Sequence, residues 1–315
     1  MSATLTQARH IIRASIALVL FVGPWASAAT TADVEFPMEL VNFEPYANNP
    51  VFTARGNGHW DVRIRERGWI LREGSAYHMW FTGYDGTQQG LKKLGYATSL
   101  DGLKWMRHAD NPICSNHWVE DVNVVKQGDT YYMFAEGLGD QSHLLSSKDR
   151  VHWKRQGQLD VRNVDGRPID PGPYGTPTAW YEDMTWYLFY ERSDLGVWLA
   201  TSKNMIVWTN LQDEPVLRPG PSSCDKDFVA LNQIIKYKGR YYAYYHGAER
   251  GNTPRLWTTN VATSTDLRHW KKYPANPLQP AKENKSSGLL VHDGQQFRLY
   301  TMHEQVHVHF PARMR

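Results

Sequence analysis

The chain has little net charge and lacks the common catalytic and cofactor motifs. Its 35 Lys and Arg residues nearly balance 32 Asp and Glu residues, which argues against a nucleic-acid partner. It contains no Gly-rich phosphate loop, no Gly-x-Ser-x-Gly nucleophile elbow and no zinc motif. Any chemistry must therefore come from side chains that the fold brings together.

Long apolar runs are also missing, so no membrane association is expected. The one marked apolar stretch, residues 16–25, is too short to span a bilayer comfortably. It follows Arg9 and Arg13 and precedes Ala-Ser-Ala at 26–28, a pattern typical of a secretory signal peptide. We expect residues 1–28 to be removed and a secreted or periplasmic protein to remain. No linker interrupts residues 29–315, which predicts a single domain.

Two interleaved repeats predict an all-β fold. An aromatic residue followed six positions later by Asn-Pro or Glu-Pro occurs at Phe43, Trp105, Trp208 and Trp270. Short aromatic runs bounded by turn residues begin at Tyr77, Tyr131, Trp186, Tyr241 and Phe297. Such runs are typical of strands, and their spacing of about 50 to 60 residues is typical of propeller blades.

The number of aromatic runs predicts a five-bladed β-propeller. No outer strand is available after Phe297, whereas Phe43 to Pro50 matches the ends of other blades. We therefore expect the N-terminal strand to close the last blade and so remove an exposed sheet edge. Cys114 and Cys224 fall on loops of blades that are not neighbours. The sequence does not exclude a disulfide between them, but we expect two free thiols.

In a propeller, the innermost strands begin around one central funnel. We expect five polar or small segments there: Glu66-Arg67, Glu120-Asp121, Gly175-Thr176-Pro177, Leu231-Asn232-Gln233 and Ser286-Ser287. The second strand of each blade returns to the same face. It ends at Asp85, Glu136, Glu191, His246 and His303-Glu304 in blades 1 to 5.

Carboxylates from different blades in one funnel are what glycoside hydrolysis needs. Asp121 is the strongest candidate, because an acid pair at the start of an apolar strand has no packing reason to be there; a capping or interblade hydrogen bond is the alternative. Glu191 lies among aromatic residues that would raise its pKa, or else forms a structural ion pair with Arg192. Asp61 or Glu66 is the expected third acid. The Arg-rich segment that contains both indicates either recognition of an anionic sugar or a structural ion-pair cluster at the funnel.

Histidines offer no complete metal site at the level of sequence. His307 and His309 face one side of the last strand, but no carboxylate or cysteine completes a ligand set with them. A surface or packing pair is the favoured interpretation. We expect no cofactor. The sequence does not decide whether a structural ion lies in the central channel.

The Asn-Pro segments, the Ala-Thr-Ser turns before Trp105, Trp208 and Trp270, and residues 119–134 together resemble five-bladed propeller glycoside hydrolases. These include the arabinanase and xylosidase group (family 43), the invertase group (family 32) and the mannoside phosphorylases (family 130). Glu120-Asp121 is similar to the Glu-Asp-Pro-Arg motif of the last group, in which the Asp is a catalytic acid. Here Val122 and Asn123 replace the Pro and the Arg.

The resemblance implies hydrolysis or phosphorolysis of a glycosidic bond in an oligo- or polysaccharide. Together with the signal-peptide pattern, it leads us to expect a secreted glycoside hydrolase, which we also expect to be a monomer. The expected catalytic residues are Asp121, Glu191 and Asp61. The expected sugar-binding residues are Glu66, Arg67, Glu120, Glu136, Thr176, Asn232 and His246. A glycoside phosphorylase or a lectin-like propeller is the alternative, although the differing funnel positions favour one central site over repeated lectin pockets.

Overall fold

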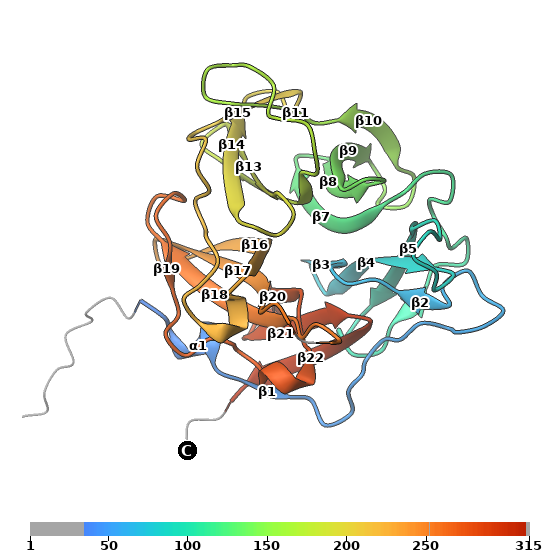
Figure 1. Ribbon diagram of the computed structural model, residues 1–315. Coiled ribbons are helices and arrows are strands. Elements are labelled where there is room, and N and C mark those ends of the chain that lie inside the picture. Colours follow the sequence, from blue (N-terminus) through green and yellow to red (C-terminus); the bar gives the residue numbers. More distant parts are fainter. Residues whose placement is uncertain (1–34, 252, 313–315) are drawn as a thin grey trace, which may run out of the picture. The chain divides into compact units, whose positions relative to one another are not determined.

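The structure is a computed structural model that describes residues 35–251 and 253–312. From Glu35 onward the chain forms one compact unit of five antiparallel-based sheets set around a centre (Figure 1). The predicted five-bladed β-propeller is confirmed. The predicted signal peptide, residues 1–28, lies outside the described residues. No described helix is long and apolar enough to cross a membrane.

Four of the five blades follow one another along the chain. Blade 1 contains β2 (Arg63–Ile64), β3 (Trp69–Glu73), β4 (Ala76–Tyr84), β5 (Lys93–Ser99) and β6 (Met106–Arg107). Blade 2 contains β7 (Glu120–Gln127), β8 (Thr130–Gly137), β9 (Gln141–Ser147) and β10 (Lys154–Gln158). Blade 3 contains β11 (Asp160–Arg162), β12 (Gly175–Glu182), β13 (Thr185–Glu191), β14 (Val197–Ser202) and β15 (Val207–Asn210). Blade 4 contains β16 (Phe228–Tyr237), β17 (Arg240–Ala248), β18 (Thr258–Ser264) and β19 (Lys271–Lys272).

The two ends of the described chain build blade 5 together. It contains β20 (Gly288–His292), β21 (Phe297–His303), β22 (Gln305–Pro311) and the N-terminal β1 (Phe43–Pro45). β1 pairs antiparallel with β22, with Phe43 opposite Pro311. The short helix α1 (Met38–Val41) precedes β1, and Leu40 packs with Phe43 in the adjoining core. The predicted closure by the N-terminal strand is confirmed.

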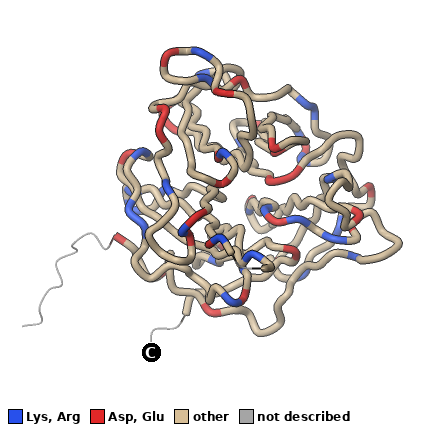
Figure 2. Tube along the Cα trace, in the orientation of Figure 1, with Lys and Arg blue, Asp and Glu red and all other residues tan. Residues whose placement is uncertain are grey.

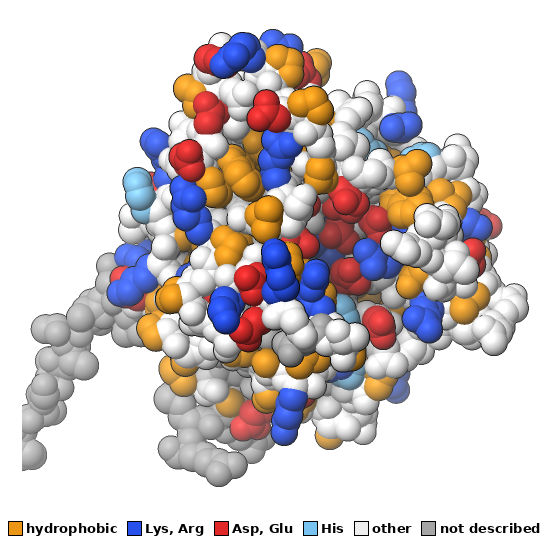
Figure 3. Space-filling model, viewed as in Figure 1, with side chains coloured by type: hydrophobic (Ala, Val, Ile, Leu, Met, Phe, Trp, Pro, Cys, Tyr) orange, Lys and Arg blue, Asp and Glu red, His pale blue; other side chains and the backbone are white. Residues whose placement is uncertain are grey.

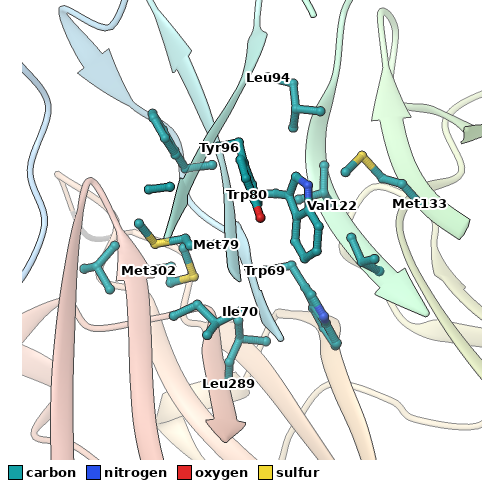
Figure 4. Packing of buried hydrophobic residues seen from close by; sticks show 14 of the residues in the cluster. Trp69, Ile70, Met79, Trp80, Leu94, Tyr96, Val122, Met133, Leu289 and Met302 are labelled. Atoms are coloured by element: carbon teal, nitrogen blue, oxygen red, sulfur yellow. The ribbon is translucent and has the colours of Figure 1, made fainter. Parts of the chain in front are cut away.

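The hydrophobic core lies between blades rather than inside any one of them. Figure 4 shows Trp80 and Tyr96 of blade 1 beside Val122 of blade 2, with Leu289 and Met302 of blade 5 nearby. Each of these side chains is buried. Every blade therefore covers its neighbour, because a single twisted sheet cannot bury both of its apolar faces alone.

The repeated turns follow from one local hydrogen-bond pattern. In the turn after β9, Asp149 accepts hydrogen bonds from two backbone N–H groups, and Trp153 donates to the Arg150 carbonyl oxygen. In the turn after β18, Asp266 and Trp270 make the same contacts. These bonds explain why the Ser-x-Asp and Trp positions recur in the sequence.

Candidate active site

One cavity of about 190 Å³ opens at the centre of the propeller and receives residues from all five blades. Figure 3 shows acidic side chains gathered in a hollow of this face, and Figure 2 shows acidic positions on several blades around the centre. Six carboxyl groups line the cavity: Glu66, Asp121, Glu136, Asp140, Glu191 and Asp194. The cavity is also lined by Arg65, Thr176, His246, Trp257, Ser287 and His303.

Four funnel residues share an unusual backbone conformation. Arg67, Asp121, Thr176 and Ser287, at equivalent positions of four blades, all have positive φ between 47° and 57°. In blade 4, the strand pairing shifts register at the equivalent Asn232, between Leu231 and Gln233. Bulges of this kind change the direction of a side chain and are common beside active sites. Non-glycine residues in this region are strained, which the surrounding contacts must offset.

Asp121 has one buried carboxyl oxygen without a described hydrogen-bond partner. The hydroxyl of Thr176 donates to Asp121 Oδ2 over 3.3 Å, whereas Oδ1 is buried with no hydrogen-bond partner among the described residues. Burial raises the pKa of Asp121 to about 8, opposed by the guanidinium of Arg67 and reinforced by the carboxylate of Glu120. Asp121 is therefore protonated at neutral pH.

Glu136 and Glu191 both hold the start of β12. Glu136 Oε2 accepts the Thr176 N–H at 2.8 Å, and Glu191 Oε1 accepts the Gly175 N–H at 3.2 Å. A Cβ at Gly175 would lie 2.2 Å from Glu136 Oε2 and 2.7 Å from Glu191 Oε1, so a larger residue there would displace both carboxyl groups. Burial raises the pKa of Glu191 to about 7 and that of Glu136 well above its usual range.

Glu66 differs from these acids in its charge state. Arg65 Nη1 lies 3.1 Å from Glu66 Oε1, and Arg65 also pairs with Glu120 at 2.9 Å. Burial alone would raise the pKa of Glu66, but the charges of Arg65 and His303 outweigh it and hold the pKa below its usual range. The cavity thus contains an ionised Glu66 beside the protonated Asp121.

Two predicted sugar-binding residues, Arg67 and Glu120, serve other groups of the protein. Arg67 is buried, and its guanidinium donates to the Asp121 and Pro177 carbonyl oxygens and to Thr178 Oγ1. Both carboxylate oxygens of Glu120 accept hydrogen bonds, one from Arg65 and one from Trp118 Nε1. Neither residue lines the cavity.

Blade 4 supplies a neutral histidine to the cavity wall. His246 Nδ1 lies 3.0 Å from Asn232 Nδ2, and its Nε2 lies 4.0 Å from Asp194 Oδ1. Burial and the charge of Arg67 lower the pKa of His246 to about 3. The ring of Trp257 meets that of His246 edge to face at 5.0 Å. Trp257 and Asp140 were not among the predicted site residues, because both lie in loops whose path the repeats do not specify.

The structure does not bring Asp61 into the cavity. Its carboxylate is fully buried and pairs with Arg55 at 2.9 Å and with Arg107 at 3.1 Å. The ion-pair alternative considered for this residue matches that arrangement. Asp61 is held by the loop before blade 1 and by β6, away from the lining residues.

Metal-ligand geometry is not found among the described residues: no three His, Cys, Asp or Glu side chains are grouped to hold an ion. His307 Nε2 lies 2.9 Å from Lys285 Nζ, and His309 Nδ1 lies 3.2 Å from the Leu299 carbonyl oxygen. Cys114 and Cys224 are both free and buried, as expected from their places on different blades.

Comparison with known proteins finds a relative named for a carbohydrate-active enzyme. The chain is 26% identical over 263 residues to a 1,2-β-oligomannan phosphorylase from Thermoanaerobacter sp. (strain X514), covering 78% of this chain and 83% of that protein. No protein-family model matches.

Solved structures agree on the fold. A glycosyl hydrolase from Bacteroides ovatus superimposes with a TM-score of 0.73 at 16% identity, covering 88% of this chain and 97% of that one. A β-1,2-mannobiose phosphorylase from Listeria innocua superimposes with a TM-score of 0.67 at 16% identity, covering 85% and 96%. The fold is therefore the five-bladed propeller of glycoside-active enzymes, which confirms the resemblance drawn from the sequence motifs.

Proposed function

We propose that this protein is a glycoside hydrolase that uses Asp121 as general acid and Glu66 as the ionised carboxylate. The observation that carries the proposal is the separation of charge states within one cavity. Burial raises the pKa of Asp121 to about 8, while neighbouring cations hold the pKa of Glu66 low. Pairs of carboxyl groups separated in this way divide acid and base roles.

In the proposed reaction, protonated Asp121 donates its proton to the glycosidic oxygen as the bond to the departing sugar breaks. Glu66 acts on the opposite side, either by activating water or by attacking the sugar directly. Its partner Arg65 holds the carboxylate in position. The two carboxyl groups come from two consecutive blades and line the same cavity.

We assign a positioning role to Glu191 and Glu136 in place of the direct catalytic role expected for Glu191. Glu191 Oε1 accepts the Gly175 N–H, and its Oε2 accepts the N–H of Asp194. These bonds keep the strand start and the loop after β13 in place around Asp121. His246 and Trp257 offer a neutral polar group and an aromatic face for sugar binding.

The relatives direct the choice of substrate towards mannosides. Both a curated relative and a solved neighbour are named for β-1,2-linked mannose compounds. The cavity of about 190 Å³ is smaller than the roughly 300–1,000 Å³ usual for drug-sized ligands, which suits one sugar ring at the cleavage point. We propose a terminal mannosyl residue as the first substrate to examine.

Phosphorolysis is the second candidate, and the names of these relatives favour it. The cavity lining favours hydrolysis, because Arg65, its one arginine among the described residues, is already paired with Glu66 and Glu120 and so is not free to bind phosphate. The ionised Glu66 would also repel a phosphate dianion. The two reactions are separated by adding phosphate: a phosphorylase needs it and forms a sugar phosphate, whereas a hydrolase forms free mannose in its absence.

The lectin alternative is less well supported by the site. A lectin-like ring would repeat its pocket between blades, but the equivalent positions carry Arg67, Asp121, Thr176, Asn232 and Ser287. Different side chains at one structural position make a single asymmetric site. Measurable glycan binding without any turnover would nevertheless favour the lectin.

The test is a turnover assay on β-1,2-mannobiose and aryl mannosides, with Asp121→Asn and Glu66→Gln beside the wild type. Each variant is expected to lower kcat by about 10²-fold or more, as for loss of a general acid or base. Asp121→Asn should recover partly on aryl mannosides whose leaving group needs no proton. Asp129→Asn, in the exposed turn after β7, is the matched control. Full activity of both cavity variants would contradict the assignment.

Export is proposed from the N-terminal sequence alone. Residues 1–28 combine Arg9 and Arg13, an apolar stretch and an Ala-Ser-Ala site. N-terminal sequencing of protein made in a bacterial host with a Sec pathway is expected to begin after Ala28. Retention of the full N-terminus in the cytoplasm would contradict the proposal.

A further inference from the structure

A second cavity of about 370 Å³ lies against blade 2 and differs in charge from the acidic cavity. Leu91, Trp118 and Leu138 give it an apolar surface, and His143 and Arg155 are among its polar groups. No Asp or Glu lines it. Leu138 is 72% exposed, so its side chain is accessible to a ligand in this cavity.

The turn between β8 and β9 is a wall common to both cavities. Glu136 and Asp140 line the acidic cavity, whereas Gly137, Leu138 and Gln141 line the second one. These residues are neighbours along the chain, so only one turn separates the two spaces. A ligand with one end in the acidic cavity can therefore continue across the turn into the second.

Trp118 provides a second connection between the two cavities. It lines the second cavity, while its Nε1 donates to Glu120 Oε1 at 2.5 Å. The other oxygen of Glu120 accepts from Arg65, which lines the acidic cavity. The indole is thus held at a fixed angle by the same ion pairs that position Glu66.

The polar groups of the second cavity can form hydrogen bonds with the hydroxyl groups of a sugar. His143 is only 3% exposed and forms a ring hydrogen bond with the Gln141 backbone, yet its Nε2 has no partner among the described residues. Burial lowers the pKa of His143 to about 4, so the ring is neutral and this nitrogen accepts a hydrogen bond. Arg155 is exposed and lines the cavity, so its guanidinium can donate to a ligand there.

We propose that the cavity between Trp118, Leu138 and Arg155 binds sugar residues of the same glycan whose terminal residue occupies the acidic cavity. An apolar indole surface, a buried acceptor and an exposed guanidinium donor match the flat faces and the hydroxyl groups of a neutral oligosaccharide. The acidic cavity holds one sugar ring, and the second cavity holds what lies beyond the cleaved bond. This inference rests on the proposed hydrolase activity.

The test compares a short substrate with a long one. Arg155→Ala and His143→Phe are assayed on an aryl mannoside and on a β-1,2-linked mannotetraose. Each variant is expected to lower kcat/KM on the tetraose by about tenfold, the effect of one lost hydrogen bond to a charged or buried group, and to leave the aryl mannoside unchanged. Arg155 lies on the exposed β10, so its variant folds even if His143→Phe does not. Arg167→Ala, an exposed arginine of blade 3, is the matched control.

The outcomes of these assays distinguish the second binding site from the proposed hydrolase activity. Equal losses on both substrates, or no loss on the tetraose, overturn the second site. If the wild type cleaves no mannoside, calorimetric titration with mannotetraose separates the two proposals. Binding that survives in Asp121→Asn and is lost in Arg155→Ala keeps the second site and overturns the hydrolase. Absence of binding to the wild type overturns both.

Discussion

At the scale of single residues, the active centre contains a residue whose backbone conformation and burial lower the stability of the fold. Asp121 has a φ of 50° and a buried Oδ1 without a partner. A strained backbone and an unpaired buried oxygen each reduce stability, by roughly 1–3 kcal/mol apiece in typical cases. The fold tolerates both because Arg67 bonds the Asp121 carbonyl oxygen at 2.6 Å and extends to blade 3.

The raised pKa of Asp121 has a consequence for stability that a variant exposes. With a pKa of about 8 when folded, against about 3.9 in an unfolded chain, Asp121 keeps its proton only in the folded state between these values. The free energy of unfolding therefore falls as pH rises through that range. Asp121→Asn cannot lose a proton, so we expect it to match the wild type near pH 4 and to exceed it at pH 8.

Thermal unfolding at pH 5, 6, 7 and 8 measures this difference. Each kcal/mol added to the free energy of unfolding raises Tm by roughly 2–4 °C for a domain of this size. We expect the Tm of Asp121→Asn to exceed that of the wild type by at least that much at pH 8. Asp129→Asn should follow the wild type at every pH. A constant gap between Asp121→Asn and wild type would contradict the raised pKa.

At the scale of elements, the β1–β22 pair decides whether the ring is closed. β1 is only three residues long, yet α1 and β1 together bury Leu40, Val41 and Phe43 against blades 4 and 5. Tyr244 of blade 4 also donates to the Leu40 carbonyl oxygen at 2.7 Å. The N-terminal segment therefore joins two blades besides completing one sheet.

Removing this segment is expected to lower stability strongly. A chain that begins at Pro50 loses three buried apolar side chains, each worth about 1.5–3 kcal/mol, and exposes the edge of β22. We expect a fall in Tm of about 10 °C or more, together with a tendency to aggregate. A chain that begins at Glu35 is the control and should unfold with the full protein. The same Tm for both chains would show that closure contributes little.

At the scale of the whole molecule, no covalent cross-link supports the described ring. Cys114 and Cys224 are free and buried in separate places. The blades are held by their shared apolar cores and by interblade bonds such as that from Arg67 to Thr178 Oγ1 at 2.5 Å. Stability is thus a property of packing around the full ring.

Thiol titration checks this arrangement. Under denaturing conditions without reductant we expect two reactive thiols per chain, and one in a Cys224→Ser variant. In the native protein at pH 8 both should react slowly, because burial raises the pKa of Cys114 and that of Cys224, the latter to about 11. Detection of no thiols after denaturation would reveal a disulfide and a different placement of these loops.

The repeats in the sequence were sufficient to predict the five blades, the closure by β1 and the funnel segments. Turn chemistry and aromatic strands are local features, so they can be recognised without knowledge of the rest of the chain. The positions equivalent to Arg67, Asp121, Thr176 and Ser287 could be aligned in the same way. Their shared left-handed backbone then appeared in the structure.

Only the tertiary structure decided which of these residues have a free functional group. Arg67 and Glu120 were expected to bind sugar but are occupied by other protein groups, and Asp61 is held by Arg55 and Arg107 outside the cavity. Charge state, likewise, depends on burial and on neighbours from other blades, as the opposite pKa shifts of Asp121 and Glu66 show. The sequence by itself determined the ring, because its signals are local; the partners of each carboxyl group were decided by contacts between residues far apart in the chain.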